Sequence, residues 1–379
     1  MFHYLDHAAT TQVRPEAAKA AFEAMTEGWG NPSSRHALGV SAAEQIKKWR
    51  GEVAQVLGCR IEEVYFTSCG TEGNNWAIQT AAEVGKRKGK HIITSVLEHS
   101  AVLEPCKALE RQGYEVTYLK PDKKGVLSMD ELSAALRPDT ILVSLMLVNN
   151  ELGTINPIAE IARRIKASGS PALFHCDAVQ GFLKVPFTPK ELGVDFLSIS
   201  GHKFHAPKGI GVLYVRNGVK LSPMILGGGQ ENGQRSGTEA TAQMAAFATA
   251  ARLGKETLER DLEHMAQLKE YAAQVLTEQV PGLVLIGEGK APHIMPISLP
   301  GYKSEVILRF LSDRGVYVSS GSACHKGKPS RIYAALGLNK KILDGVLRIS
   351  FSYDSTKEDV DALCAGLVEA QKMLFTSLS

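Results

Sequence analysis

The sequence lacks the features that mark disulfide-rich, membrane-spanning and nucleic-acid-binding proteins. Only 6 of its 379 residues are cysteine, and no two of them form a CxxC pair. Neither a disulfide scaffold nor a cysteine-pair metal motif is therefore expected. The longest apolar runs, such as residues 141–148, are far shorter than a membrane span. The formal net charge is +3, which is too small to favour nucleic acid or an acidic membrane as partner.

The chain also begins without the basic and apolar regions of a signal peptide, since residues 1–7 read Met-Phe-His-Tyr-Leu-Asp-His. With reduced thiols, this predicts a soluble cytoplasmic protein. Apolar residues make up 44% and charged residues 22% of the sequence, a composition that excludes disordered and fibrous classes. The length predicts roughly two to three domains.

From about residue 60 to residue 215, strand-like and helix-like patterns alternate. This alternation predicts βαβ units, and the wholly apolar strands favour a mostly parallel sheet covered by helices on both faces. The predicted strands are 64–67, 91–95, 115–119, 140–147, 172–175, 196–199 and 211–215, and the amphipathic stretches are 74–87, 101–112 and 158–168.

The remainder of the chain predicts a smaller α+β domain. A glycine-rich loop at 226–237 precedes one long helical pattern, 238–279, which could bridge two domains. Ser355 and Glu358 have the spacing of a capping box for the last helix. The predicted strands are 283–286, 295–299, 316–318 and 347–351, and the predicted helices are 304–314 and 356–374.

A lysine and an aspartate follow two of the predicted strands. Lys203 ends the run Ser198–Lys203, where burial can lower its pKa enough for Schiff-base chemistry, and Ser200 and His202 beside it can bind an anion. The alternative is a surface lysine. Asp177 follows strand 172–175 and, if buried, needs a positive partner such as a protonated pyridine nitrogen. The alternative is a helix N-cap.

Other polar residues stand where predicted strands give way to loops or helices. Gly70, in Phe66–Glu72, would let a phosphate approach a helix N-terminus, and Thr238 is a second phosphate candidate at the start of the long helix. Both could instead be ordinary helix starts. His99 could stack on an aromatic ring, and Asn149 and Asn150 could bind a polar ligand, although a structural histidine and a turn are the simpler explanations.

Two residues near the carboxyl terminus complete the set. Cys324 lies in the small-residue loop Ser319–Cys324 and is followed by His325, Lys326 and Lys328, surroundings that favour a reactive thiolate. Cys69 and Cys176 are the other cysteines expected near a ligand. Arg348 is a charge within an apolar strand and should pair with a carboxylate, from protein or substrate.

The order of these motifs resembles the NifS/IscS family of cysteine desulfurases over essentially the whole chain. The matching segments are Tyr4–Thr11, Gly30–His36, Thr67–Glu72, Glu98–His99, Asn149–Gly153, Asp177–Gln180, Ser200–Lys203, Arg235–Glu239, Ser319–Cys324 and Leu347–Ser350. The resemblance implies a fold-type I pyridoxal phosphate (PLP) enzyme that is a homodimer with active sites at the subunit interface. Residues 16–255 would form the large PLP-binding α/β domain, and 1–15 plus 256–379 the small α+β domain.

The same resemblance implies a role for each motif residue. Lys203 would bind PLP as a Schiff base, and His99 would stack on its ring and assist proton transfer. Asn150 and Arg348 would bind the substrate, Arg348 through its carboxylate. The other cofactor contacts would be Asp177 to the ring nitrogen, Gln180 to the ring hydroxyl, and Gly70, Thr71, Ser200 and His202 to the phosphate, with Thr238 from the second subunit.

The implied reaction converts L-cysteine to L-alanine and leaves the sulfur on Cys324 as a persulfide. A sulfur-acceptor protein, either an iron–sulfur scaffold or a tRNA- or cofactor-thiolation enzyme, would then take it. One segment departs from the family: residues 325–330 are about two residues shorter than in long-loop members, which bears on the acceptor. We also expect His325 to help maintain the Cys324 thiolate.

Rival interpretations differ in what they require of the motifs. A selenocysteine lyase, a cysteine sulfinate desulfinase or an aminotransferase would keep the PLP residues, but a desulfinase would not need Cys324. A non-catalytic scaffold or regulator would not need to keep Lys203, Asp177, His99 and Cys324 together. His175, Cys176, His202 and His205 match no zinc spacing, so we predict no metal site.

Overall fold

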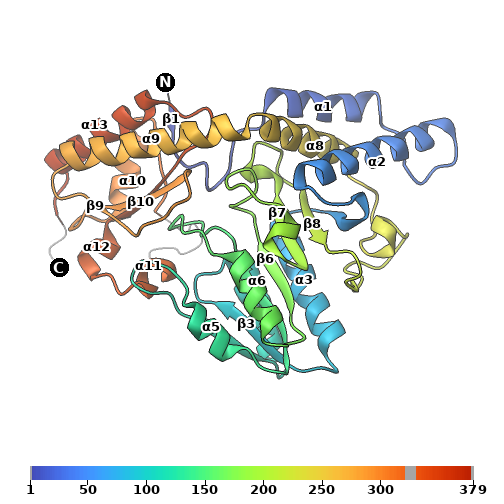
Figure 1. Cartoon of the computed structure of the whole chain (residues 1–379). Coiled ribbons are helices and arrows are strands. Elements are labelled where there is room, and N and C mark those ends of the chain that lie inside the picture. Colours follow the sequence, from blue (N-terminus) through green and yellow to red (C-terminus); the bar gives the residue numbers. More distant parts are fainter. Residues whose placement is uncertain (1, 321–329, 377–379) are drawn as a thin grey trace.

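The computed structural model describes residues 2–320 and 330–376. Cys324, His325, Lys326 and Lys328 lie outside the described residues, so the predictions for them are not addressed by it. The fold is α/β, with one large sheet and a smaller sheet region beside it (Figure 1).

The large sheet has seven strands in the order β2-β8-β7-β6-β5-β3-β4. Within it β8 runs antiparallel to both neighbours, and the strands from β7 to β4 are parallel. This confirms the predicted mostly parallel sheet. The strands are β2 (Val64–Thr67), β3 (His91–Ser95), β4 (Glu115–Leu119), β5 (Thr140–Met146), β6 (Leu173–Asp177), β7 (Phe196–Ser200) and β8 (Gly211–Val215).

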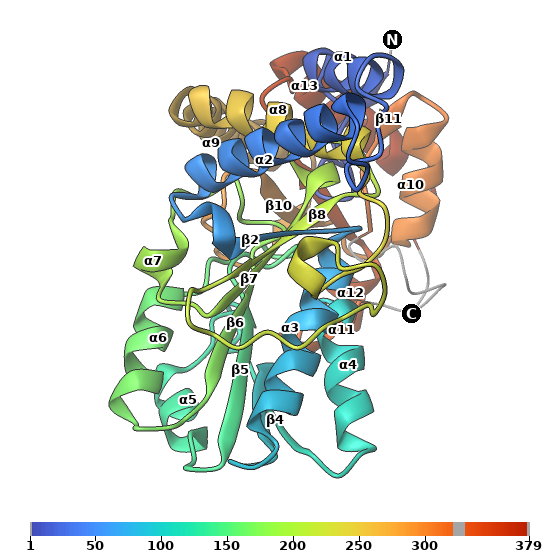
Figure 2. The same ribbon diagram turned by 90° about the vertical axis from the view of Figure 1, so that its right-hand side faces the viewer.

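Helices cover both faces of this sheet, which explains why its inner strands are buried along their whole length (Figure 2). On one face lie α3 (Gly70–Gly85) and α4 (Ser100–Glu110). On the other lie α5 (Met129–Ala135), α6 (Ile158–Ala167) and α7 (Pro189–Leu192).

The smaller region joins the two ends of the chain. Its antiparallel sheet contains β9 (Val284–Leu285), β10 (Ile294–Ser298) and β12 (Val346–Ser350), and β1 (His3–Tyr4) pairs in parallel with β11 (Val316–Tyr317). These strands share an apolar core with the surrounding helices. The helices in this part of the chain are α9 (Leu258–Gln279), α10 (Ser304–Ser312), α11 (Arg331–Ala335), α12 (Lys340–Asp344) and α13 (Lys357–Met373). Of these, α9, α10 and α13 contribute to that core, whereas α11 and α12 pack against the core of the large sheet.

The predicted long helix 238–279 is wrong, because the structure divides it into α8 (Thr241–Glu256) and α9. Thr257 lies between them, and its hydroxyl bonds both the Leu253 carbonyl, at 3.2 Å, and the Asp261 carboxylate, at 2.6 Å. Such bonds compete with the helical backbone pattern. In Figure 1, α8 packs beside α1 (Pro15–Thr26) and α2 (Ala37–Leu57), whereas α9 lies over the smaller region.

The capping box of α13 lies one residue later than predicted. Thr356, not Ser355, is the N-cap, and Asp359, not Glu358, returns the bond to its backbone N–H at 2.8 Å. Ser355 instead accepts a bond from the Ser352 N–H. The boundaries predicted at residues 15 and 255 stay a prediction.

The segments that carry the predicted site residues converge at one edge of the large sheet. Strands β2, β3, β5, β6 and β7 all end there. The chain also contains three short 3-10 turns: η1 (Ile61–Glu63) before β2, η2 (Gly201–Lys203) after β7, and η3 (Glu231–Gly233) between β8 and α8. In open α/β sheets, ligands bind at this edge. None of the helices in the described parts of the chain combines the length and apolarity needed to cross a membrane.

Candidate active site

A cavity of about 290 Å³ opens at the carboxyl ends of the parallel strands. Most of the predicted site residues line it together. They are Gly70, Thr71, His99, Asn150, Asp177, Gln180, Ser200, His202, Lys203 and Arg348. Residues more than 270 positions apart in sequence thus meet in one place, as expected when the carboxyl ends of parallel strands lie at one edge of a sheet.

Lys203 lies in η2 directly after β7, and its ammonium group is held by the N-terminal segment. Nζ donates to the carbonyls of Ala8 and Ala9, both at 2.7 Å. Burial, together with the nearby charge of Arg348, lowers the pKa of Lys203 to about 8. The predicted lowering is confirmed, and a lysine in this state has an unprotonated fraction near neutral pH that an exposed lysine lacks.

Asp177 is the last residue of β6 and is almost fully buried. Its carboxylate accepts a bond from Asn74 Nδ2 at 2.6 Å and from the Val179 N–H at 3.0 Å. Both donors are neutral, so within the described residues no cation is bonded to this buried carboxylate. A buried carboxylate of this kind favours a positive group in the cavity. Asn74 was not predicted, since nothing distinguishes an asparagine within a helix from a solvent-facing one.

The N-terminus of α3 points its first residues, Gly70 and Thr71, into the cavity. The N-cap residue Cys69 makes no side-chain capping bond and also lines the cavity, so the first turn can bind an anion. A Cβ atom on Gly70 would come within 2.6 Å of Val179 Cγ2. The close approach that requires glycine here is therefore to Val179.

His99 is the N-cap of α4, and its Nδ1 accepts a bond from the Ala101 N–H at 3.1 Å. Burial lowers the pKa of His99, and the nearby charges of Lys203 and Arg331 act in the same direction. A neutral imidazole can stack on a ring and exchange a proton. On the opposite side of Lys203, His202 Nδ1 lies 3.2 Å from Thr10 Oγ1, and burial lowers its pKa to about 4.

Arg348 has the carboxylate partner that its strand position predicts, and that partner is Asp6. Nη2 donates to Asp6 Oδ1 at 2.8 Å, and Nη1 donates to the Asn150 carbonyl at 2.8 Å. Arg348 Nε and Asn150 Oδ1 are buried and have no hydrogen-bond partner among the described residues. Since both residues line the cavity, these two atoms are free to bind a polar ligand.

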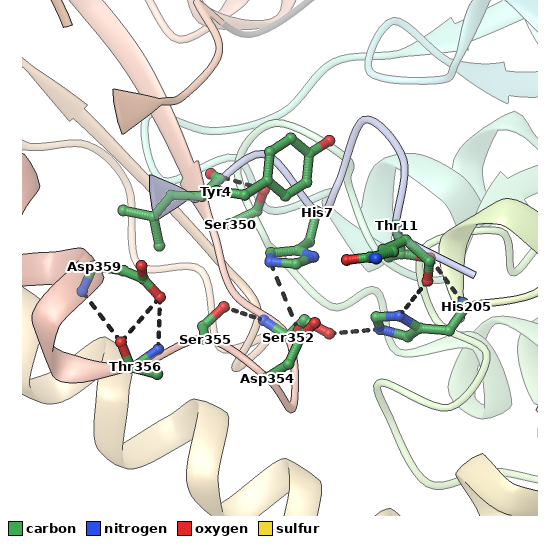
Figure 3. Close-up of polar contacts among 12 residues, drawn as sticks. Tyr4, His7, Thr11, His205, Ser350, Ser352, Asp354, Ser355, Thr356 and Asp359 are labelled. Atoms are coloured by element: carbon green, nitrogen blue, oxygen red, sulfur yellow. Dashed lines mark hydrogen bonds and ion pairs between the residues drawn. The ribbon is translucent and has the colours of Figure 1, made fainter. Parts of the chain in front are cut away.

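The N-terminal segment 4–12 connects this cavity to the smaller sheet. The Ala8 carbonyl also accepts a bond from Gln180 Nε2, and the Ala8 N–H donates to Ser350 Oγ, each at 2.8 Å. Figure 3 shows His7 and Thr11 lying between Ser350, Ser352 and His205. His205 bonds Ser352 Oγ at 2.6 Å. The segment therefore positions Lys203 against β12.

Thr238 is the predicted site residue that lies elsewhere. It is exposed, precedes the first residue of α8 by three positions, and is not among the residues lining the cavity. The expectation that it starts the helix is wrong. Its predicted contact with the cofactor of a second subunit concerns an assembly and stays a prediction.

The two cysteines expected near a ligand differ in position. Cys69 lines the cavity, whereas Cys176 is fully buried in the core of the large sheet and is not among the lining residues. Side chains alternate along a strand, so when Asp177 faces the cavity Cys176 faces away. Among the described residues, no group of three or more His, Cys, Asp or Glu side chains is arranged to hold a metal ion.

Two further residues of the site were not predicted. Arg331 lines the cavity and donates to the carbonyls of Val96 and Glu98. Asp6, which bonds Arg348, belongs to the motif Tyr4–Thr11 but was not assigned a role. The signal for Asp6 was its place in that motif, and for Arg331 it was the single positive charge at the start of an otherwise apolar helix.

The cavity fits PLP in the chemistry of its donors. Lys203 supplies an amine of lowered pKa, Asp177 supplies a buried carboxylate with neutral partners, and the start of α3 supplies N–H groups for a phosphate. PLP enzymes use these three features for the aldehyde, the ring nitrogen and the phosphate.

Comparisons with known proteins agree with this arrangement. The aminotransferase class-V family matches residues 3–363. The cysteine desulfurase IscS of Dictyoglomus turgidum is 41% identical over 362 residues, which cover 94% of this chain and 91% of that relative.

Two solved structures show the same fold. A NifS-like protein superposes with a TM-score of 0.93 at 37% identity, covering 99% of this chain and 100% of the other. SspA in complex with cysteine gives a TM-score of 0.80 at 33% identity, covering 93% of this chain and 100% of the other. The chain belongs to the aminotransferase class-V family and, within it, to the NifS/IscS group of PLP-dependent cysteine desulfurases.

Proposed function

We propose that the protein converts L-cysteine to L-alanine and transfers the sulfur to Cys324, from which an acceptor protein takes it. The observation that carries this proposal is the single cavity in which Lys203, Asp177, His99 and Arg348 meet. The names of the relatives support the reaction, and SspA was solved with cysteine bound.

Several residues of the cavity would hold PLP. Lys203 would form the covalent bond, Asp177 would pair with the ring nitrogen, and His99 would stack on the ring. Gln180 would bond the ring hydroxyl. The phosphate would be held by Gly70, Thr71, Ser200 and His202. When bound, PLP supplies an electron sink for bonds broken at the substrate's α and β carbons.

The chain's own residues bind the substrate and move its protons. Arg348 would bind the carboxylate of L-cysteine, with Asn150 Oδ1 as a second polar contact. Lys203 Nζ and His99 are the groups that can take or return a proton in the cavity, since burial lowers the pKa of both.

The sulfur step balances without an external oxidant. The Cys324 thiolate attacks the substrate sulfur, a sulfur–sulfur bond forms, and the bond from sulfur to the substrate β carbon breaks with its electron pair left on carbon. That carbon takes a proton and becomes the methyl group of L-alanine. The net change is L-cysteine plus a thiol giving L-alanine plus a persulfide.

The position of the described neighbours supports Cys324 as the acceptor. Ser319, before it, exchanges backbone bonds with Arg348, at 3.1 and 2.6 Å. Ser330 and Arg331, after it, line the cavity. Cys324 is six positions before Ser330 in the sequence, and a fully extended chain of that length spans roughly 20 Å.

A homodimer completes the proposal. Several large apolar side chains are exposed in the isolated chain, including Phe22 at 60%, Trp29 at 66% and Leu226 at 84%. Exposed apolar patches favour an interface. A second subunit would also bring Thr238 to the phosphate. The acceptor would be an iron–sulfur scaffold or a tRNA- or cofactor-thiolation protein, and the protein would act in the cytoplasm.

Mass spectrometry of the protein after one turnover tests the sulfur step. The Cys324 peptide should gain the mass of one sulfur atom when L-cysteine is added without reductant. The matched control is Cys69→Ser, which removes the cysteine that lines the cavity. Sulfur found on the Cys69 peptide in place of the Cys324 peptide would contradict the proposal.

A further inference from the structure

Arg331 makes a contact that the proposed reaction does not explain. It is the first residue of α11, only seven positions after Cys324, and its side chain lines the cavity. The two terminal nitrogens of its guanidinium each donate to a backbone carbonyl, Nη1 to Val96 and Nη2 to Glu98. The planar fork of an arginine can span two carbonyls in this way, and a lysine cannot.

The turn that Arg331 holds leads directly into His99. Within the turn, Ser95 Oγ donates to Glu98 Oε1 at 2.8 Å and accepts from the Leu97 N–H at 3.1 Å. Glu98 Oε1 also accepts from the Met146 N–H at 3.1 Å. The fork of Arg331 adds the contact from α11, so the turn is fixed from both the sheet and this helix.

The same helix, α11, is also fixed to a second loop of the cavity. Ser330 Oγ donates to Glu151 Oε2, and Tyr333 OH donates to the Glu151 carbonyl at 3.1 Å. Glu151 directly follows Asn150. The start of α11 therefore contacts both the turn before His99 and the loop that carries Asn150.

We propose that Arg331 is a positioning residue that holds the turn before His99, and with it the imidazole of His99, in place for the proposed desulfurase reaction. The charged groups that act on His99 are Asp177 on β6, Lys203 on η2 and Arg331 on α11. Arg331 itself faces Glu98, Glu104 and Glu151. Because Asp177 and Arg331 act on His99 in opposite directions, loss of Arg331 should favour the imidazolium.

Two variants separate the fork from the charge. Arg331→Ala removes both, and Arg331→Lys keeps the charge without the fork. The matched control is Arg314→Ala, which removes a forked pair with Glu369 on the exposed surface. The readouts are kcat/KM for alanine formation against pH, an NMR titration of His99 in histidine-labelled protein, and amide exchange at residues 100–103.

The proposal predicts that Arg331→Ala lowers kcat/KM by about 10- to 100-fold, as misplaced catalytic groups do. It also predicts that in this variant His99 titrates at a higher pH than in wild type, and that the acidic limb of the kcat/KM profile shifts to higher pH with it. Amide exchange at the start of α4 should be faster than in wild type. Arg331→Lys should keep the titration of wild type but show the faster exchange. Arg314→Ala should change none of these.

An Arg331→Ala protein with wild-type His99 titration and amide exchange would overturn the proposal, as would a loss of kcat/KM equal at every pH. If Arg331→Ala does not fold, Arg331→Lys with wild-type exchange overturns it. The titration and the exchange need no turnover. Absence of alanine formation by wild type would therefore count against the proposed function alone.

Discussion

Burial shifts the pKa values of several single residues in and next to the cavity in the direction that favours their uncharged form. Glu98, which precedes His99, is completely buried, and burial raises its pKa to about 8. Within the part of the chain that the structure describes, its Oε2 has no hydrogen-bond partner. The carboxyl is therefore mostly protonated in the folded protein at neutral pH, whereas it is ionised in the unfolded chain.

This difference makes Glu98 a source of pH-dependent stability. A raised folded-state pKa contributes stability that is fully present below about pH 4.5 and is lost as the pH rises through about 8. Glu98→Gln removes that loss, so its Tm should exceed that of wild type by a margin that grows from pH 6 to pH 9. Thermal unfolding in buffers of equal ionic strength measures the margin, and a constant margin would contradict the assignment.

The neutral side chain of Asn74 donates a hydrogen bond to the carboxylate of Asp177, and removal of the Asn74 side chain should weaken PLP binding. A hydrogen bond to a charged group contributes about 1.5–3 kcal/mol, so Asn74→Ala should raise the dissociation constant for PLP by roughly 10- to 100-fold. Titration of cofactor-free protein measures it. Asn75→Ala is the matched control, because Asn75 bonds the Thr71 carbonyl on the exposed side of the same helix. Equal effects of the two variants would rule out the assignment.

Sequence alone could place Lys203 and Asp177, because each follows an apolar strand and the ends of parallel strands meet at one edge. It could not find Asn74 or Arg331, because each acts through a contact between distant segments. Asp6 and Arg348 are 342 positions apart. A charge in an apolar strand predicts a partner for Arg348 but does not say which residue it is.

Among the secondary-structure elements, α3 needs a small residue at its start. A Cβ atom on Gly70 would clash with Val179 at 2.6 Å, whereas a Cβ atom on Gly51, within α2, would lie 3.8 Å from Ile61. Gly70→Ala should destabilise the protein by about 1–3 kcal/mol and weaken PLP binding. Gly51→Ala should stabilise it by about 0.5–1 kcal/mol. Urea unfolding separates the two, and a stabilised Gly70→Ala would contradict the packing described.

The positions of the elements were largely predictable, and their ends were less so. Every predicted strand of the large sheet is present within a few residues of its expected bounds. The break at Thr257 was not predicted, since an amphipathic pattern continues through it and the interruption comes from side-chain bonds to Leu253 and Asp261. The shift of the α13 cap to Thr356 has a similar origin, because Ser355 is engaged by Ser352.

For the whole molecule, buried histidines set the response to acid. Burial lowers the pKa of His7 and His202 to about 4, of His175 to about 3 and of His205 to about 2. Each binds a proton in the unfolded chain near pH 6.5. Their contribution to stability is therefore complete above pH 6.5 and is lost as the pH falls toward the folded values.

The free energy of unfolding should accordingly decrease between pH 6.5 and pH 4.5, by up to about 1.4 kcal/mol per pH unit for each such histidine. Urea unfolding at fixed ionic strength measures the slope. His175→Asn removes one fully buried contributor that lies away from the cavity lining, so its slope should be shallower. A free energy that stays constant over this range would contradict the buried, neutral state of these residues.

The central claim is that the residues lining the cavity and Cys324 take part in one reaction. The most direct test measures the alanine formed from L-cysteine by purified, PLP-loaded protein with excess reductant, in wild type and in Cys324→Ser. Cys59→Ser is the control, because burial raises the pKa of Cys59 to about 12 and its thiol is therefore protonated at neutral pH. The account predicts alanine from wild type and Cys59→Ser and almost none from Cys324→Ser. Equal alanine from Cys324→Ser would contradict it and favour a lyase or desulfinase reaction.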